Sequence, residues 1–153
     1  MDADIDSALR LTAALVIGAL IGLNRDLYGK PTGVRLHALV AMGAALFVMA
    51  GESLNVAPAL GQIIQGIIGG IGFLGAGVIV RGAMPGSVLH MTTAALIWMT
   101  AALGVVCGLG HWRLAALGTG AALIVLILGL HIDRALYGRF GPEDDLPDRK
   151  TEV

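Results

Sequence analysis

The sequence predicts an all-α integral membrane protein, a bundle of about five transmembrane helices. Of its 153 residues, 56% are hydrophobic and only 14% are charged, a balance far from that of ordinary soluble domains. No Asp or Glu lies between Glu52 and Asp133, and the only basic residues in that stretch are Arg81 and Arg113. Long apolar stretches separated by short polar seams are typical of a chain that crosses a membrane several times.

Five apolar stretches are long enough to span a bilayer, because a spanning helix needs roughly 20 predominantly apolar residues. Their apolar residues run on without the alternation that the strands of a membrane barrel show, which favours helices. The predicted spans are residues 5–23, 36–51, 61–80, 91–110 and 114–130, and we expect the last helix to continue to about Phe140. The sequence therefore predicts one transmembrane domain over residues 1–140 and a disordered cytoplasmic tail over residues 141–153.

The distribution of basic residues predicts the orientation of the bundle. Cytoplasmic loops carry an excess of Lys and Arg, and five spans place the two termini on opposite sides. One side holds only Arg10 and Arg113, whereas the other holds Arg25, Lys30, Arg35, Arg81, Arg134, Arg139, Arg149 and Lys150. We therefore expect an outside N-terminus and a cytoplasmic C-terminus in a bacterial inner membrane. The net charge of -1 gives no reason to expect nucleic-acid binding.

Polar residues gather in the loop between the first two spans, residues 24–37. One interpretation is an ordinary basic anchor at the membrane surface. The other is a functional element, since Arg35 and His37 fall at the start of a span, where a buried cation needs a partner or a wet cavity. Asp26 is the nearest available partner. The candidate polar cluster therefore comprises Arg25, Asp26, Arg35 and His37.

The third predicted span is unusually rich in glycine. Small residues let membrane helices approach closely, which predicts a central packing helix. The second interpretation, which stays open, is a locally broken helix whose carbonyls line a polar cavity together with glutamine side chains. The candidate packing or cavity residues here are Gln65, Gly69, Gly70, Gly72, Gly75 and Gly77. Gly70, Gly72 and Gly75 also have the spacing of a dinucleotide fingerprint, but no acid follows until Asp133, so we expect no nucleotide and no cofactor.

The fourth predicted span adds Thr92, Thr93 and Trp98 to the candidates. Threonine hydroxyls in a membrane helix usually bond to carbonyls of their own helix. Trp98 lies near mid-span, which predicts a partner for its indole N–H inside the bundle. The single cysteine, Cys107, is expected to be a buried structural thiol.

The membrane interior offers little for catalysis or for a divalent cation. Magnesium prefers carboxylate and water ligands, and the four spans after the first contain no acid, apart from Glu52 at one boundary. No nucleophile, base and orienting acid can be assembled there, so we expect no enzymatic activity. Whether any metal binds is left open by the sequence.

Four ordered segments resemble the MgtC/SapB (YhiD) family of membrane proteins, and the match covers nearly all of residues 8–130. The segments are GALIGLNRD at 18–26, KPTGVRLHALV at 30–40, GGIGFLGAGVI at 69–79 and TTAALIW at 92–98. One departure is Asn24, where the family usually has a Glu. The resemblance implies a polytopic inner-membrane protein with about five helices.

The same resemblance implies a link to magnesium limitation and, in pathogens, to survival inside host cells. Some members look like regulators that restrain other membrane machines, including the proton-driven ATP synthase. We therefore expect a protein that supports magnesium or ion homeostasis by modulating other membrane proteins. The alternative is a small-ion transporter. The expected partners are the lipid bilayer, other membrane protein complexes and a second copy in a homodimer.

Overall fold

The computed structural model describes residues 2–30, 32–54, 57–81 and 88–140, and within these it describes the side chains of 3–30, 32–54, 59–79 and 90–129. Five long helices occupy most of this chain, together with one two-residue antiparallel strand pair between the third and fourth helices. In order, the elements are α1 (Asp2–Leu27), α2 (Val34–Ser53), α3 (Ala57–Val78), β1 (Val80–Arg81), β2 (Val88–Leu89), α4 (Met91–Gly108) and α5 (Trp112–Phe140).

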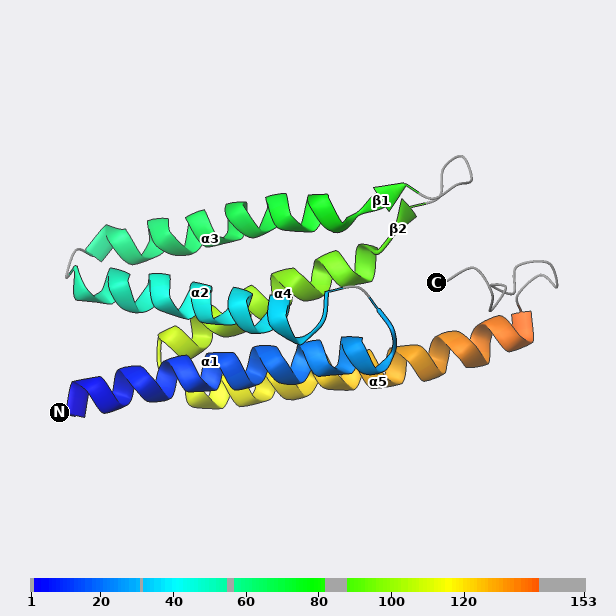
Figure 1. Ribbon diagram of the computed structural model, residues 1–153, viewed down its shortest axis with the longest axis horizontal. Helices are drawn as coiled ribbons and strands as arrows, with labels where there is room; N and C mark the ends of the chain where they lie inside the picture. Colours follow the sequence, from blue (N-terminus) through cyan, green and yellow to red (C-terminus); the bar gives the residue numbers. More distant parts are fainter. Residues whose placement is uncertain (1, 31, 55–56, 82–87, 141–153) are drawn as a thin grey trace.

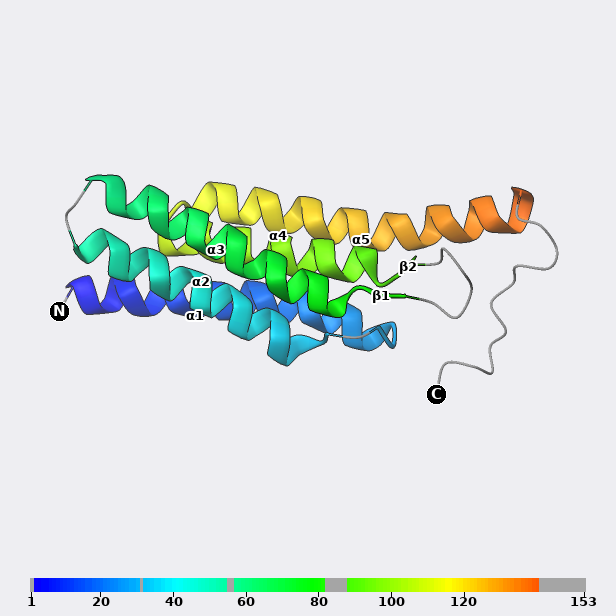
Figure 2. The ribbon, with the colours of Figure 1, turned by 90° about the horizontal axis from the view of Figure 1, so that it is seen from above.

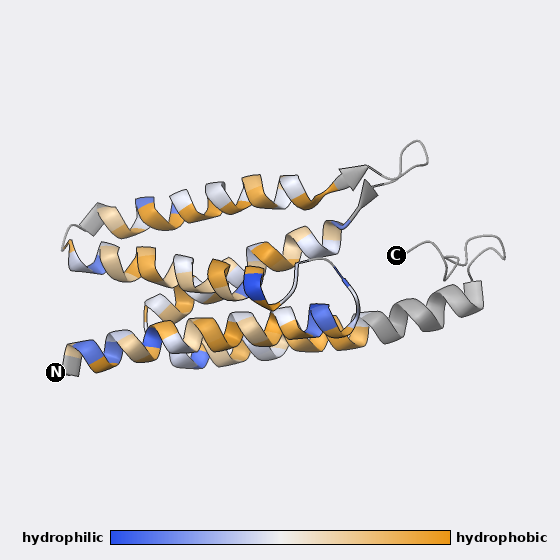
Figure 3. Ribbon diagram, in the orientation of Figure 1, coloured by the Kyte–Doolittle hydropathy of each residue, from blue (hydrophilic) through white to orange (hydrophobic). Residues whose placement is uncertain are grey.

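The predicted all-α membrane fold is confirmed. All five helices are long and apolar enough to cross a membrane, and each one coincides with a predicted span to within a few residues at its membrane boundaries. The last helix does continue to Phe140, while the predicted tail at 141–153 lies outside the described residues. Figure 3 shows hydrophobic residues along every helix, with hydrophilic residues mainly toward the helix ends.

The helices alternate in direction, so that α1, α3 and α5 run one way and α2 and α4 the other (Figures 1 and 2). The end of α1, the start of α2, the end of α3 and the start of α4 therefore share one end of the bundle, which we call the polar-loop end. In Figure 1, α3 lies on the opposite side of the molecule from α1 and α5, with α2 and α4 between them.

Helix α2 packs closely against α1 because two glycines of α1 remove the side chains from the contact. A Cβ at Gly18 would lie 2.5 Å from the carbonyl oxygen of His37, and one at Gly22 would lie 2.5 Å from Val34 Cα. These glycines are four residues apart and therefore lie on one face of the helix. This is the small-residue spacing that brings membrane helices together through backbone contact.

Helix α4 approaches the other side of α2 in the same way. A Cβ at Gly104 would lie 2.8 Å from Ala41 Cα, and one at Gly108 would lie 2.8 Å from the Ala45 carbonyl oxygen. Again the spacing is four residues. Helix α2 is thus held on two faces by backbone contacts, with α1 on one side and α4 on the other.

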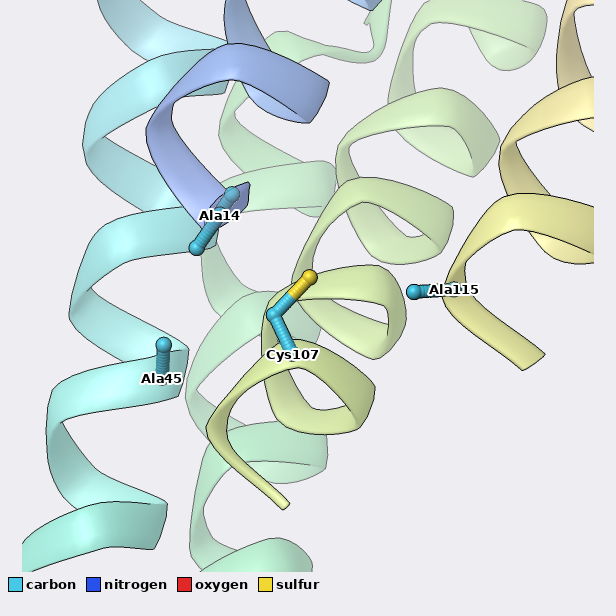
Figure 4. Close-up of a cluster of buried hydrophobic side chains, with 5 residues drawn as sticks. Ala14, Ala45, Cys107 and Ala115 are labelled. Atoms are coloured by element: carbon cyan, nitrogen blue, oxygen red, sulfur yellow. The ribbon is translucent and has the colours of Figure 1, made fainter. Parts of the chain in front are cut away.

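Among the described side chains, the core has two clusters, one of large aliphatic side chains (Ile21, Leu96, Leu103 and Leu126) and one of small side chains. Figure 4 shows Ala14, Ala45, Cys107 and Ala115, which come from four different helices and cluster around the sulfur. The Cys107 side chain is fully buried and makes no disulfide, which confirms its prediction as a buried structural thiol. Small core residues suit this bundle because dispersion contacts, and not water exclusion, hold membrane helices together.

The structure differs from the prediction at α3, which is a peripheral helix in this chain. Among its described residues only Gly75 is buried. A Cβ added at Gly66, Gly69, Gly70, Gly72 or Gly77 would meet nothing within 4 Å, and only Gly75 reaches a neighbour, Ala94 Cβ at 3.6 Å. Within one copy, the central packing glycines are therefore those of α1 and α4. The helix is continuous from Ala57 to Val78, so it is not broken along the glycine run.

At the end opposite the polar loop, Arg10 joins three helices. Its Nε lies 2.7 Å from Asp6 Oδ2, and its Nη1 lies 2.8 Å from Glu52 Oε2 at the end of α2. The same Nη1 donates a hydrogen bond of 2.7 Å to the Gly108 carbonyl at the end of α4. A cation beside the last carbonyls of a helix is favourable because those carbonyls have no partner within the helix.

Candidate functional site

Arg25 and Asp26 are adjacent in sequence but contact different helices. Arg25 is buried, with only 7% of its surface accessible to solvent. Its Nη2 donates a hydrogen bond to Thr93 Oγ1 of α4. Asp26 Oδ2 accepts a 3.0 Å hydrogen bond from the backbone N–H of Val34, the first residue of α2. One residue therefore connects α1 to α4, and the other connects α1 to α2.

The Asp26 carboxylate caps α2 across the loop. An N-terminal helix N–H lacks a partner within its own helix, and a carboxylate there is stabilising both as an acceptor and as a negative charge. Gly33 makes the contact possible, because a Cβ at that position would overlap the Asp26 carboxylate. Sequence analysis identified Asp26 but assigned it no helix to cap.

Arg35 and His37 occupy different environments, although both follow the loop. Arg35 is exposed, and among the described side chains it forms no ion pair. His37 is fully buried, with Nδ1 3.1 Å from the Gly33 carbonyl oxygen. When Nδ1–H donates this bond, Nε2 is the acceptor of the neutral ring, and Nε2 has no partner among the described residues. The four predicted residues therefore share one end of the bundle without forming one hydrogen-bonded cluster.

The threonines of α4 also occupy different environments. Thr93 is buried and contacts Arg25, whereas Thr92 is exposed. Thr100 shows the expected bond to its own helix, with its hydroxyl 2.8 Å from the Leu96 carbonyl. Trp98 differs from the prediction of an interior position, because its side chain is 48% exposed and borders a small cavity between α3 and α4.

A polar cavity of about 300 Å³ lies beside Arg25, and we call it the Arg25 pocket. Basic, hydroxyl and amide groups from α1, the following loop and α4 face it, and one turn of α5 closes its apolar side. Its lining residues are Asn24, Arg25, Tyr28, Lys30, Thr92, Thr93, Val125, Leu126 and Gly129. None of these nine residues is acidic. Sequence analysis singled out Arg25, Thr92 and Thr93, but the part played by α5 carries no signal in the sequence.

An apolar groove of about 490 Å³ separates α2 from α3, and we call it the α2–α3 groove. Gly66 and Gly70 line it, while Gln65 is exposed. The predicted polar cavity along the glycine run is therefore an apolar groove in the structure. Its remaining lining residues are Leu39, Val40, Gly43, Ala44, Phe47, Ile63, Ile67, Ile71 and Leu74.

Comparison with known proteins places this architecture in a family. The chain matches the MgtC family over residues 11–135. It is 47% identical to Protein SrpB of Synechococcus elongatus over 131 residues, an alignment that covers 78% of this chain and 72% of SrpB. It is 45% identical to Protein MgtC of Salmonella typhimurium over 121 residues, which is 78% of this chain and 51% of MgtC.

A further relative is "Putative magnesium transporter YhiD" of Escherichia coli, 36% identical over 129 residues, or 77% of this chain and 58% of YhiD. The chain thus spans only about half the length of the Salmonella protein. No solved structure matches. The extent of these matches and the five apolar helices lead to one conclusion: the chain is a multi-pass membrane protein that belongs to the MgtC family.

Proposed function

We propose that this protein acts in the bacterial inner membrane as a non-enzymatic modulator of other membrane proteins when magnesium is scarce. Membership of the MgtC family supports the link to magnesium. The structural observation that carries the proposal is on α3, where a Cβ added at six glycines would meet nothing within 4 Å. Two of them, Gly66 and Gly70, line the α2–α3 groove. Because such glycines favour close contact between membrane helices, we assign this groove-lining face of α3 to a transmembrane helix of the regulated protein.

The charge of the Arg25 pocket supports modulation more than cation transport. Arg25 and Lys30 line the cavity, and none of the nine described lining residues carries a negative charge. A divalent cation would be repelled there, and the carboxylates that usually hold magnesium are not among the lining groups. The exposed apolar groove beside α3 gives the incoming helix a complementary surface.

Growth in low magnesium tests the role of α3. Gly70→Leu fills the groove-lining face of α3 at a glycine whose added Cβ would meet nothing within 4 Å, whereas Gly120→Leu makes the same change at an equally open glycine of α5. The gene for each variant replaces the native gene, and the amount of variant protein in the membrane is measured. We expect G70L to lose growth at low magnesium and G120L to retain it. Equal growth of both variants would overturn the assignment to α3.

The oligomeric state is measured on the same variants in detergent. The sequence-based expectation of a homodimer makes a second copy the competing occupant of this face. If the wild type is a dimer and G70L a monomer, α3 joins two copies and the assignment to a different protein is wrong. If G70L leaves the oligomeric state unchanged while growth is lost, the partner is another protein.

Transport is the second candidate function, and the name of the relative YhiD favours it. The purified protein in liposomes that contain a magnesium-sensitive dye is compared with empty vesicles. We expect no flux above that of the empty vesicles. Saturable flux that Asp26→Asn abolishes would establish a transporter and overturn the proposal of a modulator.

A further inference from the structure

We propose that the Arg25 pocket binds a phosphate group, either the headgroup of an anionic phospholipid or free phosphate. This inference goes beyond the proposed function and does not depend on α3. It starts from Arg25, whose side chain is more than nine-tenths buried. Its Nη2 has a hydroxyl partner, but its Nε is buried without any partner among the described residues.

An uncompensated buried guanidinium is unusual. Removing a cation from water costs several kcal/mol unless an opposite charge or hydrogen bonds compensate it. No carboxylate among the described side chains forms an ion pair with Arg25. The neighbouring Asp26 is directed to the Val34 N–H instead. An anion that enters the pocket would supply the missing negative charge beside the guanidinium.

The other pocket groups suit a phosphate. Lys30 adds a second positive charge, and the Thr92, Thr93 and Tyr28 hydroxyls can donate hydrogen bonds to phosphate oxygens. The pocket also reaches the first turn of α4, whose N-cap residue, His90, makes no side-chain hydrogen bond to the helix. Free N–H groups at a helix start attract anions. Arginine binds phosphate in a bidentate manner, which suits the guanidinium that lines this pocket.

The position of the pocket explains how a lipid could reach it. Lys30, Tyr28 and Thr92 are exposed, whereas Arg25 and Thr93 are buried, so the cavity leads from the surface to the guanidinium. It lies at the polar-loop end of the bundle, where the chain leaves its apolar spans. Basic pockets between transmembrane helices on the cytoplasmic side are typical binding places for phospholipid headgroups.

Lipid retention tests the proposal on the full chain. The purified protein is incubated with phosphatidylglycerol or with phosphatidylcholine, and bound lipid is counted by native mass spectrometry. Arg25→Gln, Lys30→Gln and Thr93→Val change the pocket, whereas Arg35→Gln removes an exposed cation from the same end that does not line the pocket. We expect the wild type to prefer phosphatidylglycerol, R25Q and K30Q to lose about tenfold in affinity, and R35Q to lose less than about twofold.

Free phosphate is tested separately in phospholipid-free detergent, by its effect on the thermal midpoint compared with chloride at equal ionic strength. A rise in midpoint that R25Q abolishes, without a preference for phosphatidylglycerol, assigns the pocket to free phosphate. Lipid preference without this rise assigns it to the headgroup. If R25Q fails to fold, K30Q carries the test, because Lys30 is exposed.

Two results would overturn the proposal. Equal losses in R35Q and the pocket variants would show general attraction to a basic surface. The other concerns Asp133, which follows Gly129 by four residues in the sequence and whose side chain lies outside the described residues. If wild type binds neither phosphate nor phosphatidylglycerol, while Asp133→Asn binds either one, the partner of Arg25 is a carboxylate of the chain itself.

Discussion

Gly104 marks the closest approach of α4 to α2, and Gly104→Ala tests the packing directly. The new Cβ would lie 2.8 Å from Ala41 Cα and 2.9 Å from its carbonyl carbon, whereas ordinary Cβ contacts begin at 3.4 Å. The two helices must therefore separate by roughly 0.5 Å or more, and such a gap forfeits about a quarter or more of the dispersion attraction across a contact. Overpacking costs typically reach about 1–3 kcal/mol. We expect G104A to lower the free energy of unfolding by about 2 kcal/mol.

The single cysteine provides the assay, because Cys107 is fully buried and reacts with a fluorogenic maleimide only when the bundle opens. A loss of about 2 kcal/mol corresponds to a midpoint lower by about 4–8 °C in a chain of this size. Gly70→Ala is the matched control, since its Cβ meets nothing within 4 Å, and its midpoint should be unchanged or slightly higher. Gly104 lies one turn from Cys107, so size-exclusion profiles after heating provide a second measurement. Equal midpoints in G104A and G70A would refute the backbone contact.

Three further predictions use the same unfolding assay. Arg10→Gln should lower the free energy of unfolding by about 1 kcal/mol, and this loss should shrink in high salt because the ion pairs of Arg10 are partly exposed. A loss that is the same at low and high salt, and the same with or without Glu52→Gln, would contradict this prediction. Gly33→Ala should lower the free energy of unfolding by about 1 kcal/mol, because it displaces the Asp26 cap from Val34. Adding Asp26→Ala to this variant should lower it little further, and fully additive losses would contradict the shared contact. The Cys107 thiol of the folded protein should react at least about tenfold more slowly than in denaturant, and equal rates would show that the core around it is open.

The helices could be predicted from the sequence because spanning length and charge exclusion are properties of each segment alone. The buried thiol followed from its place inside an apolar span. The order of the helices in space was harder. Glycine spacing of four residues occurs in α1, α3 and α4 alike, and nothing local says which of these faces meets a helix of the same chain.

The candidate site was predictable only as a list of polar residues near one loop. A helix rotates each successive side chain by about 100°, so Arg25 and Asp26 diverge to different neighbours even though they are adjacent. Which neighbour each one reaches depends on how α2 and α4 pack, and this packing depends on glycines such as Gly22 and Gly104, which carry no charge themselves. The apolar wall that α5 gives to the Arg25 pocket follows from that packing as well.

The two arginines of α1 lead to the last prediction. Arg10 has two carboxylates within 2.8 Å, whereas the more deeply buried Arg25 has a hydroxyl partner and, among the described residues, no partner for its Nε. Replacing a buried ion pair by apolar side chains of similar volume is often neutral or stabilises a protein by about 1–4 kcal/mol, and we expect the same direction for a buried cation whose counter-charge is not among the described residues. In phospholipid-free detergent, Arg25→Met should therefore raise the thermal midpoint. With phosphatidylglycerol the order should reverse, because only the wild type gains the bound headgroup. Arg35→Met is the control, and if R25M is less stable than the wild type under both conditions, Arg25 is already compensated within the chain.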